Sequence, residues 1–259
     1  DERQCLDSPE SYSCRTLKYI IENTQGDVAV NYTQTSQIKC NMIPINIPRN
    51  LRTIKIMGSH PNKCTPLFQK MCSARIKFFF TSEINVSWIG ICFHSEKLIF
   101  HNNIESLGYL SLYIQKCVWT GNKAGYNRNE ELNSGSLGYY NLHIEVARSM
   151  RLIIQNSQLN SCLISLKAPY FSVNLTNVNF TSIMKFPCSL MTILPVYRKR
   201  EGEQFMSLTN PTWFIARNAI TVWHCLVRAL SADQKFLSIN GQNEIISITE
   251  CSFHRTTQV

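Results

Sequence analysis

The chain has few carboxylates. Only four of its 259 residues are Asp, and three of them, Asp1, Asp7 and Asp27, precede residue 28. Hydrolysis of a glycosidic bond needs convergent carboxylates, and a calcium-dependent lyase needs an acidic metal site. The shortage therefore argues against both kinds of enzyme, and we expect no catalytic residues and no cofactor.

Long apolar runs and familiar catalytic motifs are also missing. No run approaches the roughly 18 apolar residues of a membrane helix, and the polar start at residues 1–4 does not resemble a signal peptide. We therefore expect any membrane segment to lie outside this chain. The sequence contains no Gly-x-Ser-x-Gly elbow and no phosphate-binding loop. The closest cysteine pairs have no His at zinc-ligand spacing, so we expect no metal site.

Charge is scarce overall but is mostly positive. Charged residues make up 17% of the chain and hydrophobic residues 44%, which excludes a disordered chain and allows a large core. The formal net charge of +9 suggests an anionic partner such as a sulfated glycan or an acidic protein. The candidate binding residues are Arg148, Arg151, Arg198, Lys199 and Arg200. A solubilising surface is the alternative, and nucleic acid is disfavoured because aromatic residues do not alternate with the basic ones.

Cysteine, by contrast, is abundant. Eleven cysteines spread along the chain are typical of a disulfide-bonded protein of the secretory pathway. Since the number is odd, at least one thiol is left over or pairs outside the chain. The disulfide candidates are Cys5, Cys14, Cys40, Cys64, Cys72, Cys92, Cys162, Cys188, Cys225 and Cys251.

Four N-glycosylation sequons support the same compartment. They begin at Asn31, Asn85, Asn174 and Asn179, whereas proline excludes the one at Asn210. Asn174 and Asn179 alternate with apolar neighbours, so both should point outward from a strand. We expect an extracellular or cell-surface glycoprotein.

Two kinds of local structure are indicated. Leu17, Ile20 and Ile21 recur at helical spacing, which predicts one short amphipathic helix over residues 13–23 with Ser13 as its cap. Beyond residue 37 the pattern changes to short apolar runs with a period of two, which is typical of strands. The chain therefore divides into an N-terminal cap, residues 1–36, and a β region, residues 37–259.

The β region contains a recurring unit. Its form is apolar, x, apolar, x, x, small or Cys, x, bulky apolar, and it begins at Leu112, Leu152, Val173, Ile220 and Ile246. Separations of 21 and 26 residues between neighbouring units, and of 40 to 47 elsewhere, indicate stacked coils. Each coil then buries its apolar face only against its neighbours.

The residues between the two halves of a unit suggest a ladder. Asn102, Asn156 and Asn177 each follow an inward apolar residue by two positions, so stacked side-chain amides can share hydrogen bonds. With these units and corners, the chain resembles the right-handed parallel β-helix, or pectin-lyase-like, superfamily. The resemblance implies an all-β solenoid whose short N-terminal helix caps the first coil. A pair of β-sandwiches is the alternative.

That superfamily includes polysaccharide lyases and glycoside hydrolases. Arg75-Ile76-Lys77 matches the triplet of its hydrolase branch by letter, but the acids that the triplet would serve are absent. A degenerate carbohydrate-active enzyme using Arg75, Lys77, Glu83 or Glu96 remains an alternative function.

Cys225 and Cys251 occupy the same inward position in consecutive units. In adjacent coils their Cα atoms would lie about 4.8 Å apart, which is within disulfide range although parallel Cβ vectors are not well placed. Either a disulfide or a ladder of free thiols fits this spacing.

Recognition is expected on loops. The polar insertion at 121–136 is flanked by tyrosines, and Tyr126, Tyr139 and Tyr140 are candidate contacts for a protein ligand. We therefore predict a non-catalytic binding or adhesion module, part of the ectodomain of a cell-surface receptor or membrane protein. A subunit that binds its protein ligand through residues 121–140 and a sulfated-glycan-binding protein are the other possibilities.

Overall fold

The protein was analysed as a computed structural model, which describes residues 17–32, 42–59, 64–66, 75–94, 97–102, 108–120, 141–181, 189–194, 219–228, 235–239 and 245–254. In these ranges the chain is almost entirely β-strand, with one helix, α2 (Leu17–Asn23). The predicted all-β class is confirmed. The helix ends where the sequence predicted, whereas residues 13–16 lie outside the described ranges. No helix in the described part of the chain has the length and hydropathy of a membrane span.

The strands form two sheets, one of 13 strands and one of 7. The larger sheet has two limbs that share two long strands. Its first limb contains β1 (Gly26–Tyr32), β3 (Leu51–Gly58), β6 (Ile84–Ile89), β9 (Tyr109–Gln115), β12 (Ser149–Asn160), β14 (Tyr170–Thr181), β16 (Ala219–Trp223) and β19 (Ile245–Thr249). Its second limb contains β4 (Thr65–Pro66), β7 (Ile91–Phe93), β10 (Val118–Thr120), the ends of β12 and β14, β17 (Leu226–Arg228) and β20 (Ser252–His254). The smaller sheet contains β2 (Met42–Asn46), β5 (Arg75–Phe80), β8 (Lys97–Asn102), β11 (Leu142–Glu145), β13 (Ile164–Lys167), β15 (Ser189–Leu194) and β18 (Lys235–Ile239).

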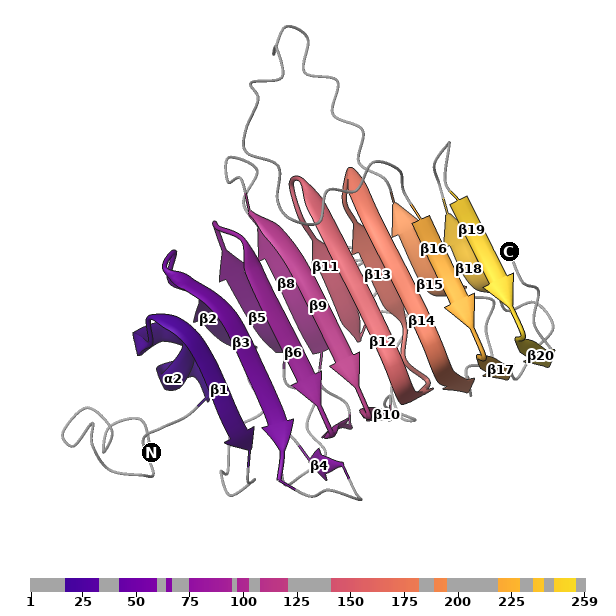
Figure 1. The fold of residues 1–259 in the computed structure, drawn as a ribbon, viewed down its shortest axis with the longest axis horizontal. Coiled ribbons are helices and arrows are strands. Elements are labelled where there is room, and N and C mark those ends of the chain that lie inside the picture. Colours follow the sequence, from indigo (N-terminus) through magenta and orange to yellow (C-terminus); the bar gives the residue numbers. More distant parts are fainter. Residues whose placement is uncertain are drawn as a thin grey trace, which may run out of the picture.

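All described strand pairs are parallel. From β5 onward the chain passes in turn through the small sheet, the first limb and the second limb, and then returns to the small sheet. We call one such passage a coil. Figure 1 shows the strands following one another along the long axis, with colours in sequence order from one end to the other. Antiparallel hairpins, which would build a pair of β-sandwiches, do not occur among the described strands.

Inward side chains stack in rows because paired strands keep their register, apart from a shift between Gly26 and Asp27 at the start of β1. In the first limb, one row of buried residues runs through Val28, Ile54, Val86, Leu112, Leu152, Val173 and Ile220. In the small sheet, another runs through Ile45, Phe78, Phe100, Ile144, Leu166 and Ile193. Burying each such side chain contributes about 1.5 to 3 kcal/mol, so the rows supply most of the stabilising energy.

Aromatic residues continue the stacking in the core. The rings of Phe78 and Phe100 lie parallel with centroids 4.7 Å apart, and those of Phe93 and Trp119 lie 4.2 Å apart. Trp88 contacts both groups edge-on, through Phe78 and Phe93. The core of the two sheets is therefore continuous.

Helix α2 lies where β1 and β2 end the two sheets (Figure 1). Ile21 is fully buried, and the side chain of Glu22 accepts a 2.8 Å hydrogen bond from the backbone N–H of Asn46 in β2. The helix thus ties itself to the first strand of the small sheet. The predicted boundary between residues 1–36 and 37–259 falls after β1, which already pairs with β3.

Candidate binding site

A left-handed corner separates the two limbs of the large sheet. One residue in each of six coils has a positive φ between 49° and 66°. These residues are Gly90, Lys116, Asn156, Asn177, His224 and Glu250. Glycine and asparagine tolerate this conformation best, which explains why three of the corners carry them. The corner turns the strand direction and presents the corner side chains to solvent.

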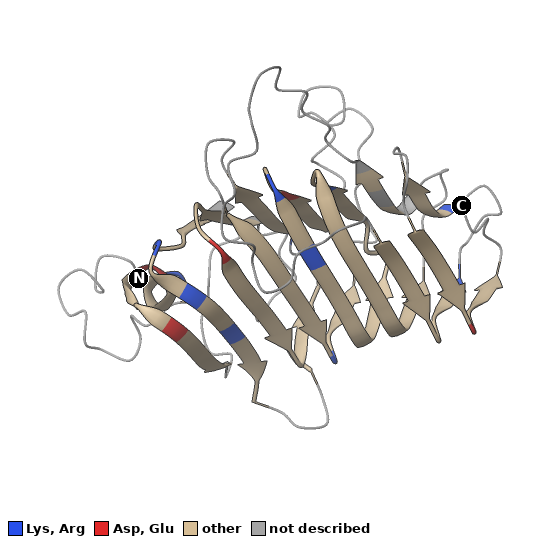
Figure 2. Ribbon diagram, turned by 45° about the horizontal axis from the view of Figure 1, so that its top comes forward, with Lys and Arg blue, Asp and Glu red and all other residues tan. Residues whose placement is uncertain are grey.

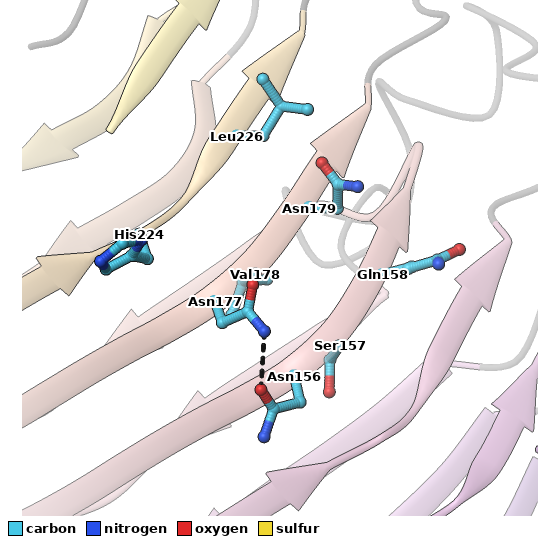
Figure 3. Close-up of a pocket in the computed structure, with 8 residues that line it drawn as sticks. All are labelled: Asn156, Ser157, Gln158, Asn177, Val178, Asn179, His224 and Leu226. Carbon is cyan, nitrogen blue, oxygen red and sulfur yellow. Dashed lines mark hydrogen bonds between the residues drawn. The ribbon is translucent and has the colours of Figure 1, made fainter. Parts of the chain in front are cut away.

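Two corner asparagines form an amide ladder. Asn177 Nδ2 donates to Asn156 Oδ1 of the preceding coil at 2.7 Å (Figure 3). The predicted ladder is therefore confirmed for these two residues. It is wrong for Asn102, which ends β8 of the small sheet, far from the corner in the coil. Asn102 is buried, makes no side-chain hydrogen bond to the described residues, and occupies the space beside Gly108, where an added Cβ would clash with its Nδ2.

The residue after each corner points inward and is often Ser or Cys. Ser157 Oγ accepts a 3.1 Å hydrogen bond from the backbone N–H of Cys117, and Cys251 Sγ accepts one of 3.4 Å from that of Cys225. Cys225 and Cys251 are free thiols, so the structure has the thiol ladder and not the disulfide. The role of both residues is structural.

Outside this corner lies an open depression of about 370 Å³ (Figure 3). Its lining comes from three adjacent coils and consists of Asn156, Ser157, Gln158, Asn177, Val178, Asn179, His224 and Leu226. The corner residues form one line, and the registered row Gln158, Asn179 and Leu226 forms a second. Amide groups therefore dominate the lining, and Leu226 adds an apolar contact.

An exposed tryptophan stands next to the depression. Trp223 is 45% exposed, and its ring meets that of His224 edge-on with centroids 4.4 Å apart. Trp223 Nε1 donates to Glu250 Oε2 at 3.2 Å, and the same carboxylate forms an ion pair with His224 when the imidazole is protonated. These contacts hold the indole in place while leaving nearly half of its surface open.

A second polar cluster lies on the outer face of the small sheet. Glu145 Oε2 is 3.6 Å from His143 Nε2 and 3.8 Å from His101 Nδ1. His143 is only 2% exposed, and its burial, with the nearby Lys167 ammonium, lowers its pKa to about 4 although Glu145 opposes the shift. Burial also lowers the pKa of His101, against the effect of Glu145. Both imidazoles are therefore neutral at pH 7.

The cysteines divide into one disulfide and four free thiols in the described residues. Cys64 and Cys92 are bonded, with Cα atoms 5.1 Å apart. Cys117, Cys162, Cys225 and Cys251 are free. The disulfide candidate Cys162 is therefore corrected to a free, buried thiol, and for Cys225 and Cys251 the thiol ladder is found in place of the disulfide. The candidates Cys5, Cys14, Cys40, Cys72 and Cys188 lie outside the described ranges.

Burial keeps these thiols protonated. It raises the pKa of Cys117 to about 12 and that of Cys225 to about 11, and it also raises the pKa of Cys162. The thiolate is the reactive form, so these three thiols are unreactive at neutral pH.

All four sequons lie on the large sheet. Asn31 in β1 and Asn179 in β14 are exposed, whereas Asn85 in β6 and Asn174 in β14 are half-buried. Asn174 and Asn179 point outward between the buried residues of their strand, as their alternation predicted. Thr176 Oγ1 donates to Asn174 Oδ1 at 2.8 Å within the sequon itself.

The described basic residues do not align into a stripe on the large sheet. Arg151 is exposed on β12, but its neighbours in register are Ser111 and Ser172. Arg148 donates to the hydroxyl of Tyr109 at 3.2 Å. Figure 2 shows blue and red segments close together on the first strands of this sheet, whereas the later strands are mostly uncharged.

The predicted contact residues Tyr126, Tyr139, Tyr140, Arg198, Lys199 and Arg200 lie outside the described ranges, as does Glu96, a candidate residue of the degenerate enzyme. Of the residues considered for a degenerate enzyme, Lys77 lies over the ring of Phe79, with Nζ 4.5 Å from the centroid. Glu83 is exposed before β6, and Arg75 begins β5.

Sequence reasoning did not find the two polar clusters. Trp223, His224 and Glu250 belong to consecutive units, and their meeting follows only from the 26-residue coil length. His143 and Glu145 alternate on one strand, which was a usable signal, but the pairing of Glu145 with His101 needs the register of β8 and β11. Among the described residues, no group of three or more His, Cys, Asp and Glu side chains is arranged to hold a metal ion.

Comparison with known proteins gives no relative for this chain: no family model, no curated protein and no solved structure matches it significantly.

Proposed function

We propose that the chain is a right-handed parallel β-helix that acts as an extracellular, non-catalytic binding or adhesion module, part of the ectodomain of a cell-surface protein. The ordered passage through the small sheet, first limb and second limb supports the solenoid, because stacking of such coils explains why every described strand pair is parallel. A solenoid of this kind holds side chains on its outer faces at fixed spacing. That suits recognition of a partner.

Several features support the extracellular assignment. The Cys64–Cys92 disulfide is typical of an oxidising compartment, and the four sequon asparagines all lie on outward positions of strands. Buried thiols with raised pKa values, such as that of Cys117, survive there because the reactive thiolate is suppressed.

One observation carries the binding role: Trp223 is exposed and yet held in place by Glu250 and His224, beside a depression lined by amides. A fixed aromatic side chain loses little conformational entropy on binding and is the residue type that contributes most to recognition. The partner is a cell-surface protein or a glycan, and no cofactor, metal or nucleic acid is needed.

The test is binding of the purified, glycosylated protein to a broad glycan array and to a panel of cell-surface proteins, at low and high salt. We expect retention of a specific partner and at least a tenfold loss of affinity in Trp223→Ala. Tyr170→Ala is the matched control, because Tyr170 is 47% exposed on the same sheet but at the start of β14. Equal binding by both variants, or no binding to any partner, contradicts the proposal.

The salt series tests the sulfated-glycan alternative. Retention of sulfated glycans that weakens at high salt, and that is lost when Arg198, Lys199 and Arg200 are neutralised, would assign recognition to that basic segment. Retention of a partner that does not change with salt concentration and that depends on Trp223 supports recognition at Trp223 and the adjacent depression.

A further inference from the structure

We infer that the depression outside the left-handed corner is a binding site for an uncharged saccharide such as a β-linked disaccharide of N-acetylglucosamine. The inference rests on the proposed function, because it names the ligand class of the surface beside Trp223. It is carried by the amide ladder, the apolar contact of Leu226 and the absence of formal charge from most of the lining.

The amide side chains supply the hydrogen bonds that a sugar requires. Each amide offers two donors and two acceptor positions. The bond between Asn177 Nδ2 and Asn156 Oδ1 uses one donor and one acceptor of this pair and fixes both planes. Hydroxyl and acetamido groups of a saccharide act as both donor and acceptor, so they match the remaining amide groups, with Gln158 and Asn179 in the next row (Figure 3).

The electrostatics favour an uncharged ligand. Of the eight residues that line the depression, only His224 can carry a charge, and its ion-pair partner is Glu250. No Lys or Arg is among the described residues of the lining, so a sulfate or carboxylate group would lose its hydration there without gaining one of these cations. The C–H face of a sugar ring is apolar and can pack on Leu226, while the exposed indole of Trp223 stands beyond His224.

Such a saccharide could come from two sources. Asn179 begins a sequon and its exposed side chain forms part of the wall, so an N-linked glycan on this residue would place its first sugar rings, which are N-acetylglucosamine, beside the depression. An oligosaccharide of another molecule is the second source. The volume of about 370 Å³ is near the lower end of the roughly 300–1,000 Å³ of small-ligand pockets.

The test measures binding of N,N′-diacetylchitobiose by saturation-transfer NMR and titration. Thr181→Ala removes the sequon and retains the Asn179 amide, and it is compared with the natural chain, whose occupancy at Asn179 is read by mass spectrometry. We expect the Thr181→Ala protein to bind the probe. Adding Asn177→Ala or Leu226→Trp should weaken binding at least fivefold, the first by removing amide contacts and the second by filling the depression.

Two matched variants control for general effects. Gln115→Ala removes an outward amide of β9 that does not line the depression, and Arg228→Trp adds the same indole two residues along β17. Both should bind as the Thr181→Ala parent does. Because Leu226→Trp can disturb the strand, its thermal unfolding is compared with that of Arg228→Trp, and Gln158→Ala provides a second loss-of-contact variant.

The outcomes separate the sources. If the Thr181→Ala protein binds the probe and the chain glycosylated at Asn179 does not, the depression is occupied by the chain's own glycan. If both bind, the ligand is external. Failure of the Thr181→Ala protein to bind, or binding that Asn177→Ala, Gln158→Ala and Leu226→Trp leave unchanged, overturns the inference. A protein partner that depends on Trp223 while chitobiose does not bind would leave the proposed function standing and remove only this inference.

Discussion

The backbone N–H of Cys117 donates to Oγ of Ser157 in the next coil, across a distance of 3.1 Å. The left-handed corner interrupts the regular ladder at this point, so the N–H depends on a side chain for its acceptor. Ser157 Oγ in turn donates to the carbonyl of Gln155 at 2.8 Å. Cys225 and Cys251 repeat the arrangement, with Cys251 Sγ accepting from Cys225 N–H and donating to the carbonyl of Thr249 at 3.1 Å. The small or cysteine position of the repeat is thus a hydrogen-bonding position.

This relationship predicts the effect of removing the acceptor. Ser157→Ala should lower the free energy of unfolding by about 1 to 3 kcal/mol, because the buried N–H of Cys117 is left without a partner. Ser157→Cys should be milder, since a thiol performs the same role at Cys251. Equilibrium urea denaturation measures both, and a Ser157→Ala protein as stable as the natural one contradicts the assignment.

The corner conformation gives a second prediction. Asn156 has a φ of 49°, in a region that a β-branched residue enters only with strain. Asn156→Val should cost about 2 kcal/mol or more, from the left-handed backbone and the lost amide bond together. Asn156→Gly relieves the backbone and should cost less.

Lys116 provides the comparison for this corner. It has a φ of 52° and an exposed side chain outside the amide ladder. Lys116→Gly should therefore leave thermal stability unchanged or raise it slightly, whereas Lys116→Val should lower it. A stable Lys116→Val protein would show that these corners adjust their backbone freely.

The regular parts of the coil were predictable from the sequence, since inward positions alternate along each strand and repeat between coils. Val173, Leu175, Val178 and Phe180 are all buried, while Asn174 between them faces outward. The pattern also placed the Asn156–Asn177 contact, because these residues are the same number of positions after an inward residue in adjacent coils. Local spacing in the sequence was sufficient to predict burial and contacts wherever consecutive coils have the same residue pattern.

Contacts between unlike parts of the coil could not be predicted in this way. Asn102 has the same local spacing as Asn156 but ends a strand of the small sheet, and local spacing does not state which sheet a strand belongs to. The disulfide partner of Cys64 depends on the register of β4 and β7. The cluster around Glu145 likewise needs the lateral pairing of β8 with β11.

The disulfide should contribute to stability by restricting the unfolded chain. Cys64 and Cys92 are 28 residues apart, and a loop of this size corresponds to about 3 to 4 kcal/mol in the chain-entropy model. The free energy of unfolding of the double variant Cys64→Ser/Cys92→Ser should therefore be lower by this amount. Equilibrium denaturant titration measures the difference. A smaller shift would indicate that the unfolded chain keeps structure around this loop.

Acid should destabilise the protein through His143. The pKa of His143 in the folded protein is about 4, below the ordinary histidine value of 6.5. A lowered pKa means that the unfolded chain binds the proton first, so this contribution is fully present above pH 6.5 and is lost as the pH falls towards 4. The loss should reach up to about 3 kcal/mol below pH 4, to which His101, with its pKa shifted in the same direction, adds.

Replacing the imidazole isolates this effect. His143→Gln keeps a polar, hydrogen-bonding side chain but cannot take up a proton, so its free energy of unfolding should depend less on pH between 6.5 and 4. Denaturant titrations at each pH provide the slope. His101→Gln is the matched control, because His101 is more exposed and should account for a smaller part of the slope. An unchanged slope in His143→Gln, with a large change in His101→Gln, would show that His101, and not His143, causes most of the acid sensitivity.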